Sequence, residues 1–114
     1  EIFDHAKETG KPRNSVLASV DAILLFEGVM LFRQDITSAF DYRILVDTSF
    51  DVALKRAKKR DLKHFGDMKT LLDKYTRRFI PGQKRYIEEH RPEETVDIIV
   101  GNDNPDDPTL RFRN

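Results

Sequence analysis

Most of the chain mixes apolar and polar residues, but one stretch is an unbroken apolar run. Residues 22–26 are five successive apolar positions, and Glu27 and Gly28 follow them directly. Apolar residues without alternation indicate a strand buried on both faces, as in a parallel α/β sheet. The pattern therefore predicts a buried strand whose carboxyl end delivers a carboxylate, at the edge where open α/β sheets bind ligands.

Two further apolar segments predict strands, and helical patterns lie between them. Residues 42–47 and 96–100 are short and rich in β-branched residues. Between these segments, apolar positions recur at helical spacing in three stretches, 50–57, 68–79 and 83–90. Strands that alternate with helices favour a parallel α/β sheet with flanking helices, formed by residues 1–114 as one unit. We expect the tail, residues 103–114, to be irregular.

Capping and turn residues predict where the helices begin and end. Residues 48–51 have the spacing of a capping box, and Asp67 is placed to cap the next helix. The pair Pro81–Gly82 is expected to interrupt or kink the helical pattern. Arg91–Pro92 is expected to end it.

Composition and charge narrow the classes of function. The chain has 20 basic and 20 acidic residues and no net charge, so no global field attracts it to nucleic acid or a membrane. It contains no cysteine, which excludes disulfides and thiolate metal sites and is compatible with a reducing cytoplasm. No apolar stretch approaches the roughly 20 residues that span a bilayer. We therefore expect a cytoplasmic protein without membrane or nucleic-acid partners.

Glu27 is the first candidate for chemistry. A carboxylate at the end of a buried strand can hold Mg²⁺, usually through water, beside substrate phosphates. It can equally cap a helix or form a salt bridge. Asp47 ends the next predicted strand in the same way, although its neighbours favour a capping role. His64 and His90 are expected to be exposed to solvent.

The second candidate is a run of basic residues on the face opposite the apolar one and at the end of the helix predicted after the capping box at 48–51. Arginine offers forked donors to phosphate oxygens, and lysine adds a mobile charge. The alternative is a solvated helix face. Tyr75 and Phe79, at helical spacing further along, are expected in the core. The basic residues are Lys55, Arg56, Lys58, Lys59, Arg60 and Lys63.

Four segments, in order and spacing, resemble motifs of one family, and together they span roughly residues 20–105. Leu24–Val29 is similar to a strand that carries an acidic residue. Ala53–Asp61 is similar to a lid motif, Arg-Leu-x-Arg-Arg-x-x-Arg-Asp. Arg56, Arg60 and Asp61 match this motif, whereas alanines at 53 and 57 replace two of its arginines. The other two segments are Val96–Val100, similar to an Ala-Asp-x-Ile-Ile strand, and the stretch from Tyr75 to Tyr86, with Ile80-Pro81-Gly82-Gln83. The family is the uridine kinase and phosphoribulokinase family of P-loop kinases; the last segment and Asn102–Pro105 look closest to a bacterial uridine-kinase-like branch.

This resemblance implies a P-loop NTPase fold of the nucleoside kinase type and transfer of the γ-phosphoryl group of ATP to a nucleoside hydroxyl, with uridine as an example. By the same resemblance, Glu27 would help to hold Mg²⁺, and residues 55–67 would form a lid. Arg56 and Arg60 would bind ATP and stabilise the transferring phosphoryl group. Asp4 and His5 match a Tyr-Asp substrate-binding segment more weakly. The resemblance leaves the formation of a homo-oligomer open.

The motif that such kinases use to bind ATP phosphates does not occur in these 114 residues. There is no Gly-x-x-x-x-Gly-Lys-Ser/Thr sequence, whose backbone amides and lysine cradle the phosphates. We therefore expect an incomplete P-loop fold, the C-terminal part of a kinase domain that is inactive alone. In related folds the P-loop strand lies between the strands predicted at 22–26 and 42–47, so these strands must pair directly, leave exposed edges or recruit another chain. The alternatives are a nucleotide- or phosphate-binding module without turnover and a regulatory interaction domain.

Overall fold

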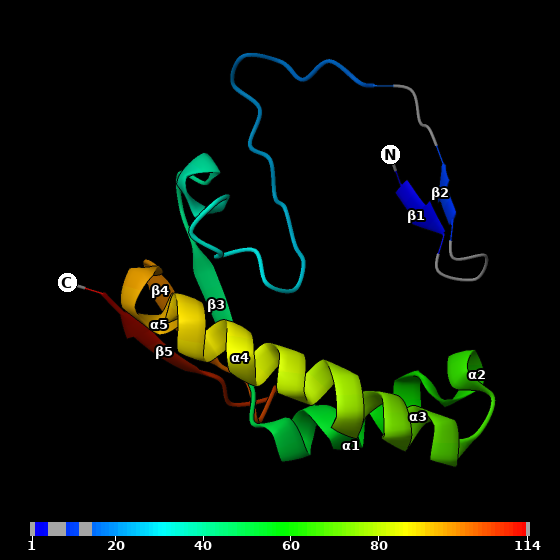
Figure 1. Cartoon of the computed structure of the whole chain (residues 1–114). Coiled ribbons are helices and arrows are strands. Elements are labelled where there is room, and N and C mark those ends of the chain that lie inside the picture. Colours follow the sequence, from blue (N-terminus) through cyan, green and yellow to red (C-terminus); the bar gives the residue numbers. More distant parts are fainter. Residues whose placement is uncertain (1, 5–8, 12–14, 114) are drawn as a thin grey trace.

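The computed structural model describes residues 2–4, 9–11 and 15–113 of the chain. Near the N-terminus, β1 (Ile2–Asp4) and β2 (Thr9–Lys11) form a small antiparallel pair. The other strands form one three-stranded sheet, and helices extend from it as a long hairpin (Figure 1). The part of the chain that the structure describes contains no helix long and apolar enough to cross a membrane.

The larger sheet has the strand order β3-β4-β5 and is mixed rather than parallel. β3 (Ile44–Asp47) and β4 (Ile98–Gly101) pair in parallel, which confirms the second and third predicted strands within two residues. β5 (Thr109–Phe112) pairs antiparallel with β4, so the prediction of an irregular tail was wrong for these four residues, whereas residues 103–108 are irregular as predicted. A four-residue strand gives a weak pattern, and only the partner beside it satisfies its backbone groups.

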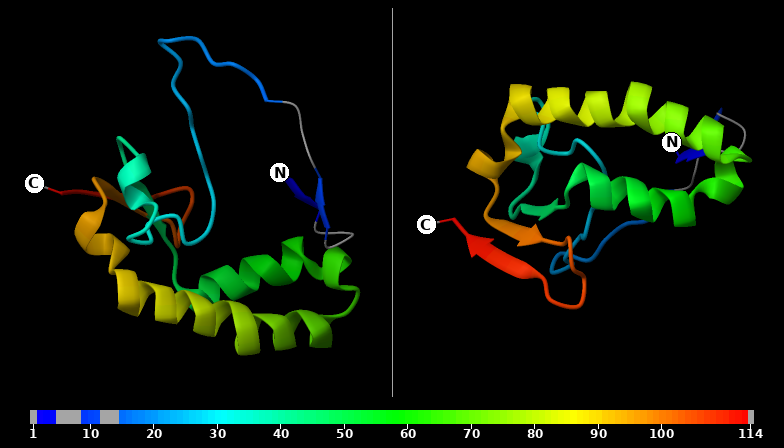
Figure 2. Two further views of the ribbon diagram at one scale, coloured as in Figure 1. Left: turned by 45° about the horizontal axis from the view of Figure 1, so that its top comes forward. Right: turned by 90° about the horizontal axis from the view of Figure 1, so that it is seen from below.

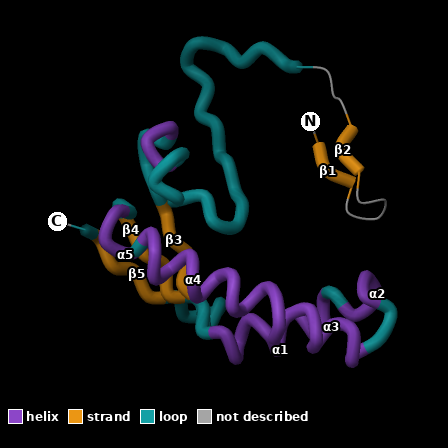
Figure 3. The backbone as a smooth tube through the Cα atoms, viewed as in Figure 1, coloured by secondary structure: helices purple, strands orange, loops and turns teal. Residues whose placement is uncertain are grey.

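The predicted strand at 22–26 is also wrong. The structure describes residues 15–36 without a strand, and Ile23, Leu24 and Leu25 are each more than 80% exposed. Figure 3 shows this segment as a loop that runs apart from the sheet. A strand needs a neighbour to accept and donate its backbone hydrogen bonds. β3 pairs with β4 instead, and no described residue pairs with 22–26.

One face of the sheet is apolar and largely uncovered. The register places six apolar side chains on this face, which we call the apolar sheet face: Ile44, Val46, Ile98, Val100, Leu110 and Phe112. Four of them, from β3 and β5, are 46–63% exposed. The whole chain exposes 9863 Å², whereas a compact protein of this mass exposes about 6,500 Å². The exposed segment at 15–27 and this largely uncovered face contribute to the excess.

The helices form two antiparallel limbs that lie side by side in both views of Figure 2. One limb is α1 (Phe50–Arg60), followed by the short α2 (Leu62–Phe65) at the tip of the hairpin. The other limb is one continuous rod of α3 (Met68–Lys74), the π-helical turn η2 (Tyr75–Phe79) and α4 (Ile80–His90). Lys84 lies 5.5 Å from the centre of the Phe50 ring, across the two limbs. The short α5 (Pro92–Thr95) leads into β4, and η1 (Thr37–Ala39) precedes β3.

The sequence predicted that Pro81–Gly82 interrupts or kinks the helical pattern, but the second limb is not interrupted there. A proline inside an α-helix removes one hydrogen bond and clashes with the carbonyl group four residues earlier. Here the turn before it is π-helical: the N–H of Ile80 donates to the carbonyl of Tyr75, five residues back. This wider turn lets the rod continue through Pro81 and end at His90, where Arg91 adopts a left-handed conformation (φ 42°).

The capping predictions had opposite outcomes. Asp67 caps α3 as expected, because its Oδ1 accepts from the N–H of Thr70 at 2.8 Å. The capping box at 48–51 does not form: Ser49 is the N-cap of α1, and no side chain caps this helix.

The buried apolar core among the described residues is small. It consists of Ala57, Leu71, Val96, Ile98 and Ile99.

Candidate functional site

The carboxyl ends of β3 and β4 meet at one edge of the sheet, where the chain leaves for α1 and for the loop at 102–103. This loop is tied to the β3–α1 junction by two hydrogen bonds. The N–H of Asn102 donates to the carbonyl of Asp47 at 2.8 Å, and the N–H of Ser49 donates to Asp103 Oδ1 at 2.7 Å. Asp103 therefore accepts a hydrogen bond from the backbone of Ser49, the N-cap residue of α1.

Arg56 reaches this edge from the middle of α1. Its Nη2 donates to the carbonyls of Asn102 at 2.7 Å and Asp103 at 3.0 Å. An open hollow of about 230 Å³ lies beside it, lined by Val52, Lys55, Arg56, Lys59 and Asp103. Three cations line a hollow that contains one carboxylate, so the hollow favours an anionic group such as phosphate.

Arg60 lies one helical turn further along α1, on the same face as Arg56. Its Nε and Nη2 donate to the two carboxylate oxygens of Asp61 at 2.6 and 2.8 Å. The hydroxyl group of Tyr75 donates to Asp61 Oδ2 at 2.6 Å. The structure therefore brings Tyr75 into contact with a basic motif 14 residues earlier in the chain, whereas the sequence predicted only a core position for it.

These contacts change the ionisation of both partners. The hydrogen bond from Arg60 lowers the pKa of Asp61 to about 2 despite partial burial, and the bond from Tyr75 acts in the same direction. Burial, and then the bond to Asp61, raises the pKa of the Tyr75 hydroxyl. Because the pKa of Asp61 is lower in the fold than its ordinary value of 3.8, its ionised carboxylate stabilises the fold at pH values above 3.8. This contribution is lost as the pH falls toward 2.

Glu27 is not brought to Arg56 or Arg60 by any contact in the described residues. It lies exposed in the loop that precedes residue 28. Within residues 2–4, 9–11 and 15–113, no group of three or more histidine, aspartate or glutamate side chains could hold a metal ion. Its assignment as a magnesium ligand remains a prediction.

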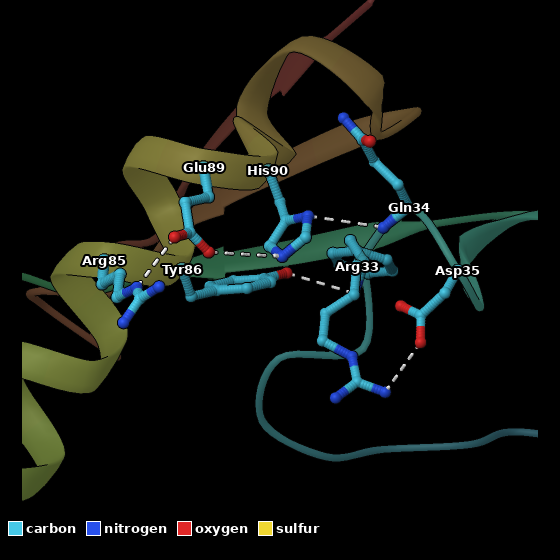
Figure 4. Close-up of polar contacts among 8 residues, drawn as sticks. Arg33, Gln34, Asp35, Arg85, Tyr86, Glu89 and His90 are labelled. Carbon is cyan, nitrogen blue, oxygen red and sulfur yellow. Dashed lines mark hydrogen bonds and ion pairs between the residues drawn. The ribbon is translucent and has the colours of Figure 1, made fainter.

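The segment after Glu27 is attached to α4. The N–H of Phe32 donates to the hydroxyl oxygen of Tyr86 at 3.1 Å, and the N–H of Gln34 donates to His90 Nδ1 at 3.5 Å (Figure 4). The side chain of His90 is only 23% exposed, so the prediction of an exposed histidine was wrong here. His64 is exposed, as predicted. The two bonds fix the end of the loop that carries Glu27.

Replacing Tyr86 by Phe removes the acceptor of the Phe32 N–H and keeps the ring. We expect the amide hydrogen of Phe32 to exchange about fivefold faster, since one net hydrogen bond contributes about 1 kcal/mol. Hydrogen-exchange NMR measures this rate. The control is Tyr42→Phe, because Tyr42 is 59% exposed. Equal exchange at Phe32 in both variants would show that the bond does not hold the segment.

The predicted substrate residues lie at the edge of what the structure describes. Asp4 is the last residue of β1 and pairs with Thr9. His5 lies outside the described residues. Their role in substrate binding therefore remains a prediction.

Asp97, within the predicted third strand, makes a hydrogen bond that stabilises the sheet. Its Oδ2 accepts from the N–H of Arg43 at 2.7 Å, which joins the starts of β3 and β4. This contact across 54 residues was not readable from the sequence, and neither was the pairing of Asp61 with Tyr75. The one available signal was that Asp61 directly follows Arg60 in a recognisable motif.

Comparisons with known proteins agree with the sequence motifs. The family model "Phosphoribulokinase / Uridine kinase family" matches residues 1–104. A uridine kinase of Alkaliphilus metalliredigens is 27% identical over 105 residues, covering 90% of this chain and 50% of that protein. A uridine kinase of Clostridium tetani is 29% identical over 115 residues, covering 89% of this chain and 54% of that protein. The chain thus spans about half the length of these curated relatives, and no solved structure matches it significantly.

Proposed function

The chain belongs to the phosphoribulokinase/uridine kinase family, and on that premise we propose that it is the lid-bearing part of a uridine kinase-like phosphotransferase. The parent enzyme would move the γ-phosphoryl group of ATP to a nucleoside hydroxyl. The observation that supports this role best is the placement of Arg56 beside the loop at 102–103, with Arg60 one turn away on the same helix face. Two guanidinium groups one turn apart on a helix face could bind successive phosphates of a polyphosphate chain.

Phosphoryl transfer of this kind depends mainly on positioning and on neutralising charge. Arg56 would contribute a guanidinium group whose Nη2 is fixed by two backbone carbonyls, and Lys55 and Lys59 would add positive charge around it. Residues 55–67, from the second half of α1 to the cap of α3, would act as the lid over the phosphates. Asp4 and His5 would contact the nucleoside.

Magnesium is the expected cofactor, and Glu27 is the residue that would hold it or its water. An exposed carboxylate fits this ion, because Mg²⁺ is usually bound by one or two carboxylates together with waters and substrate phosphates. When bound, the ion would neutralise charge on the phosphates of ATP. Glu27 itself would supply one oxygen ligand from a loop anchored through Phe32 to α4.

We further propose that the 114-residue chain does not catalyse transfer alone. It contains no glycine-rich phosphate loop, and four of the six side chains on its apolar sheet face are 46–63% exposed. A parallel strand pair such as β3–β4 normally lies in a sheet with both faces covered. A further polypeptide segment is therefore needed to complete the domain.

A binding module without turnover is the second candidate, because the cationic hollow beside Arg56 exists without the phosphate loop. Two experiments distinguish these candidate functions. The first is calorimetric titration of the chain with ATP and with uridine, and the second is an assay for ATP-dependent phosphorylation of uridine. We expect weak binding and no turnover. Measurable turnover would sink the proposal that the chain is inactive alone, and no heat with either ligand would favour a regulatory interaction domain.

A further inference from the structure

Arg60, Asp61 and Tyr75 form a three-membered contact that joins the two limbs of the helical hairpin. Arg60 is the last residue of α1, Asp61 follows it, and Tyr75 begins η2 on the opposite limb. Both carboxylate oxygens accept from the guanidinium group, and the tyrosine hydroxyl donates to Oδ2 as well. The Asp61 side chain is 19% exposed, whereas that of Arg60 is 73% exposed.

The two bonds to Asp61 leave part of the guanidinium group available. They use Nε and one N–H of Nη2, so Nη1 and the second N–H of Nη2 remain as donors. The ring of Tyr75 is held in turn by edge-to-face contacts with Phe65 and Phe79, whose centroids lie 6.5 and 5.1 Å away. The Asp61 carboxylate is thus held by Tyr75, whose ring packs in an aromatic cluster, and the carboxylate in turn orients the Arg60 guanidinium group.

Fixing an arginine in advance has a direct effect on binding. A free arginine side chain loses about 2 kcal/mol of rotamer entropy when it is immobilised. A side chain already held in a bidentate pair has lost part of this freedom before the ligand arrives, so less is lost on binding.

We propose that Asp61 and Tyr75 are positioning residues, which hold the Arg60 guanidinium group so that its remaining N–H donors meet the phosphate oxygens of a polyphosphate ligand. This inference rests on the proposed function, because it assigns the ligand class of the same helix face. Asp61 and Tyr75 do not touch the ligand; they act through Arg60.

The same hairpin provides a matched control. Arg77 and Asp73 form an exposed ion pair at 2.8 Å with side chains 82% and 56% exposed, and both residues lie on the second limb. This pair has the same chemistry but is confined to one limb and has no tyrosine partner among the described residues. Its removal should not affect an anion bound at Arg60.

The test uses the 114-residue chain and inorganic triphosphate as the probe. Binding is measured by NMR titration of the arginine Nε–H signals in the wild type, Asp61→Asn, Tyr75→Phe and Asp73→Asn. We expect the dissociation constant to rise three- to tenfold in Asp61→Asn and about threefold in Tyr75→Phe, which keeps the aromatic ring. It should change less than twofold in Asp73→Asn, and far-ultraviolet circular dichroism checks that each variant is folded.

A double-mutant cycle distinguishes positioning from a general structural role. If Asp61 acts through Arg60, Asp61→Asn should have no further effect on triphosphate binding in the Arg60→Gln background. An equal effect in both backgrounds would assign Asp61 a structural role and overturn the inference.

The inference and the proposed function fail in different ways. If the wild type binds triphosphate and the Asp61 and Tyr75 variants bind it equally well, the positioning role is wrong and the proposed function stands. If the wild type does not bind triphosphate at all, the proposed phosphate-binding function fails, and the positioning role fails with it.

Discussion

Replacing Leu71 by Ala is expected to lower the free energy of unfolding by about 3 kcal/mol. Leu71 is a completely buried side chain of α3 and one of the few residues in the apolar core. Its truncation removes apolar contacts and leaves a cavity, because the surrounding side chains relax only partly into the space. Urea denaturation followed by circular dichroism measures the change.

The control for Leu71 lies on the same helix. Met68 begins α3 and is 38% exposed, so Met68→Ala should cost less than about 1 kcal/mol. A variant of Leu71 that is already unfolded without urea meets the expectation. Equal stability of the two variants would contradict the burial of Leu71 and the packing of α3.

Replacing Glu27 by Gln is expected to lower the turnover of an active kinase that contains this chain by about 10- to 100-fold. A loss of about 10- to 100-fold in activity is typical when a residue that holds a metal ion through a bound water or another ligand is replaced. The substitution keeps the size of the side chain but removes the negative charge that attracts Mg²⁺. Nucleoside binding should change little, so steady-state kinetics should show the effect on kcat rather than on KM for the nucleoside.

Asp35 provides the comparison for Glu27. It is an exposed carboxylate of the same segment and pairs only with Arg33, at 3.2 Å, among the described residues. Asp35→Asn should leave turnover within about twofold. A Glu27→Gln variant with unchanged turnover would remove Glu27 from the mechanism and leave its carboxylate a solvated loop residue.

Local patterns predicted the parts of the fold that depend on neighbours in the chain. Apolar residues at helical spacing predicted the helical stretches at 50–57, 68–79 and 83–90, and Asp67 caps α3 through a residue three positions on. α4 ends at Arg91–Pro92 because a residue before proline disfavours the right-handed helical conformation. In each case the determining interaction spans only a few residues.

Some local patterns had outcomes that their own residues could not determine. The run at 22–26 has the composition of a buried strand, yet it is exposed because no described strand lies beside it. Residues 109–112 form a strand because β4 offers a free edge at the right register. Pro81 continues a helix because η2 widens the turn before it.

The sequence by itself determined the family, through the order and spacing of its motifs, and the positions of Arg56 and Arg60 one turn apart on a helix. Only the tertiary structure decided what these arginines touch. Arg56 contacts carbonyls 46 and 47 residues later in the chain, and Arg60 is held by an aspartate that a tyrosine of the opposite limb fixes. Such contacts form between distant segments, because the packing of strands and helices brings their atoms together, and no pattern within either segment encodes them.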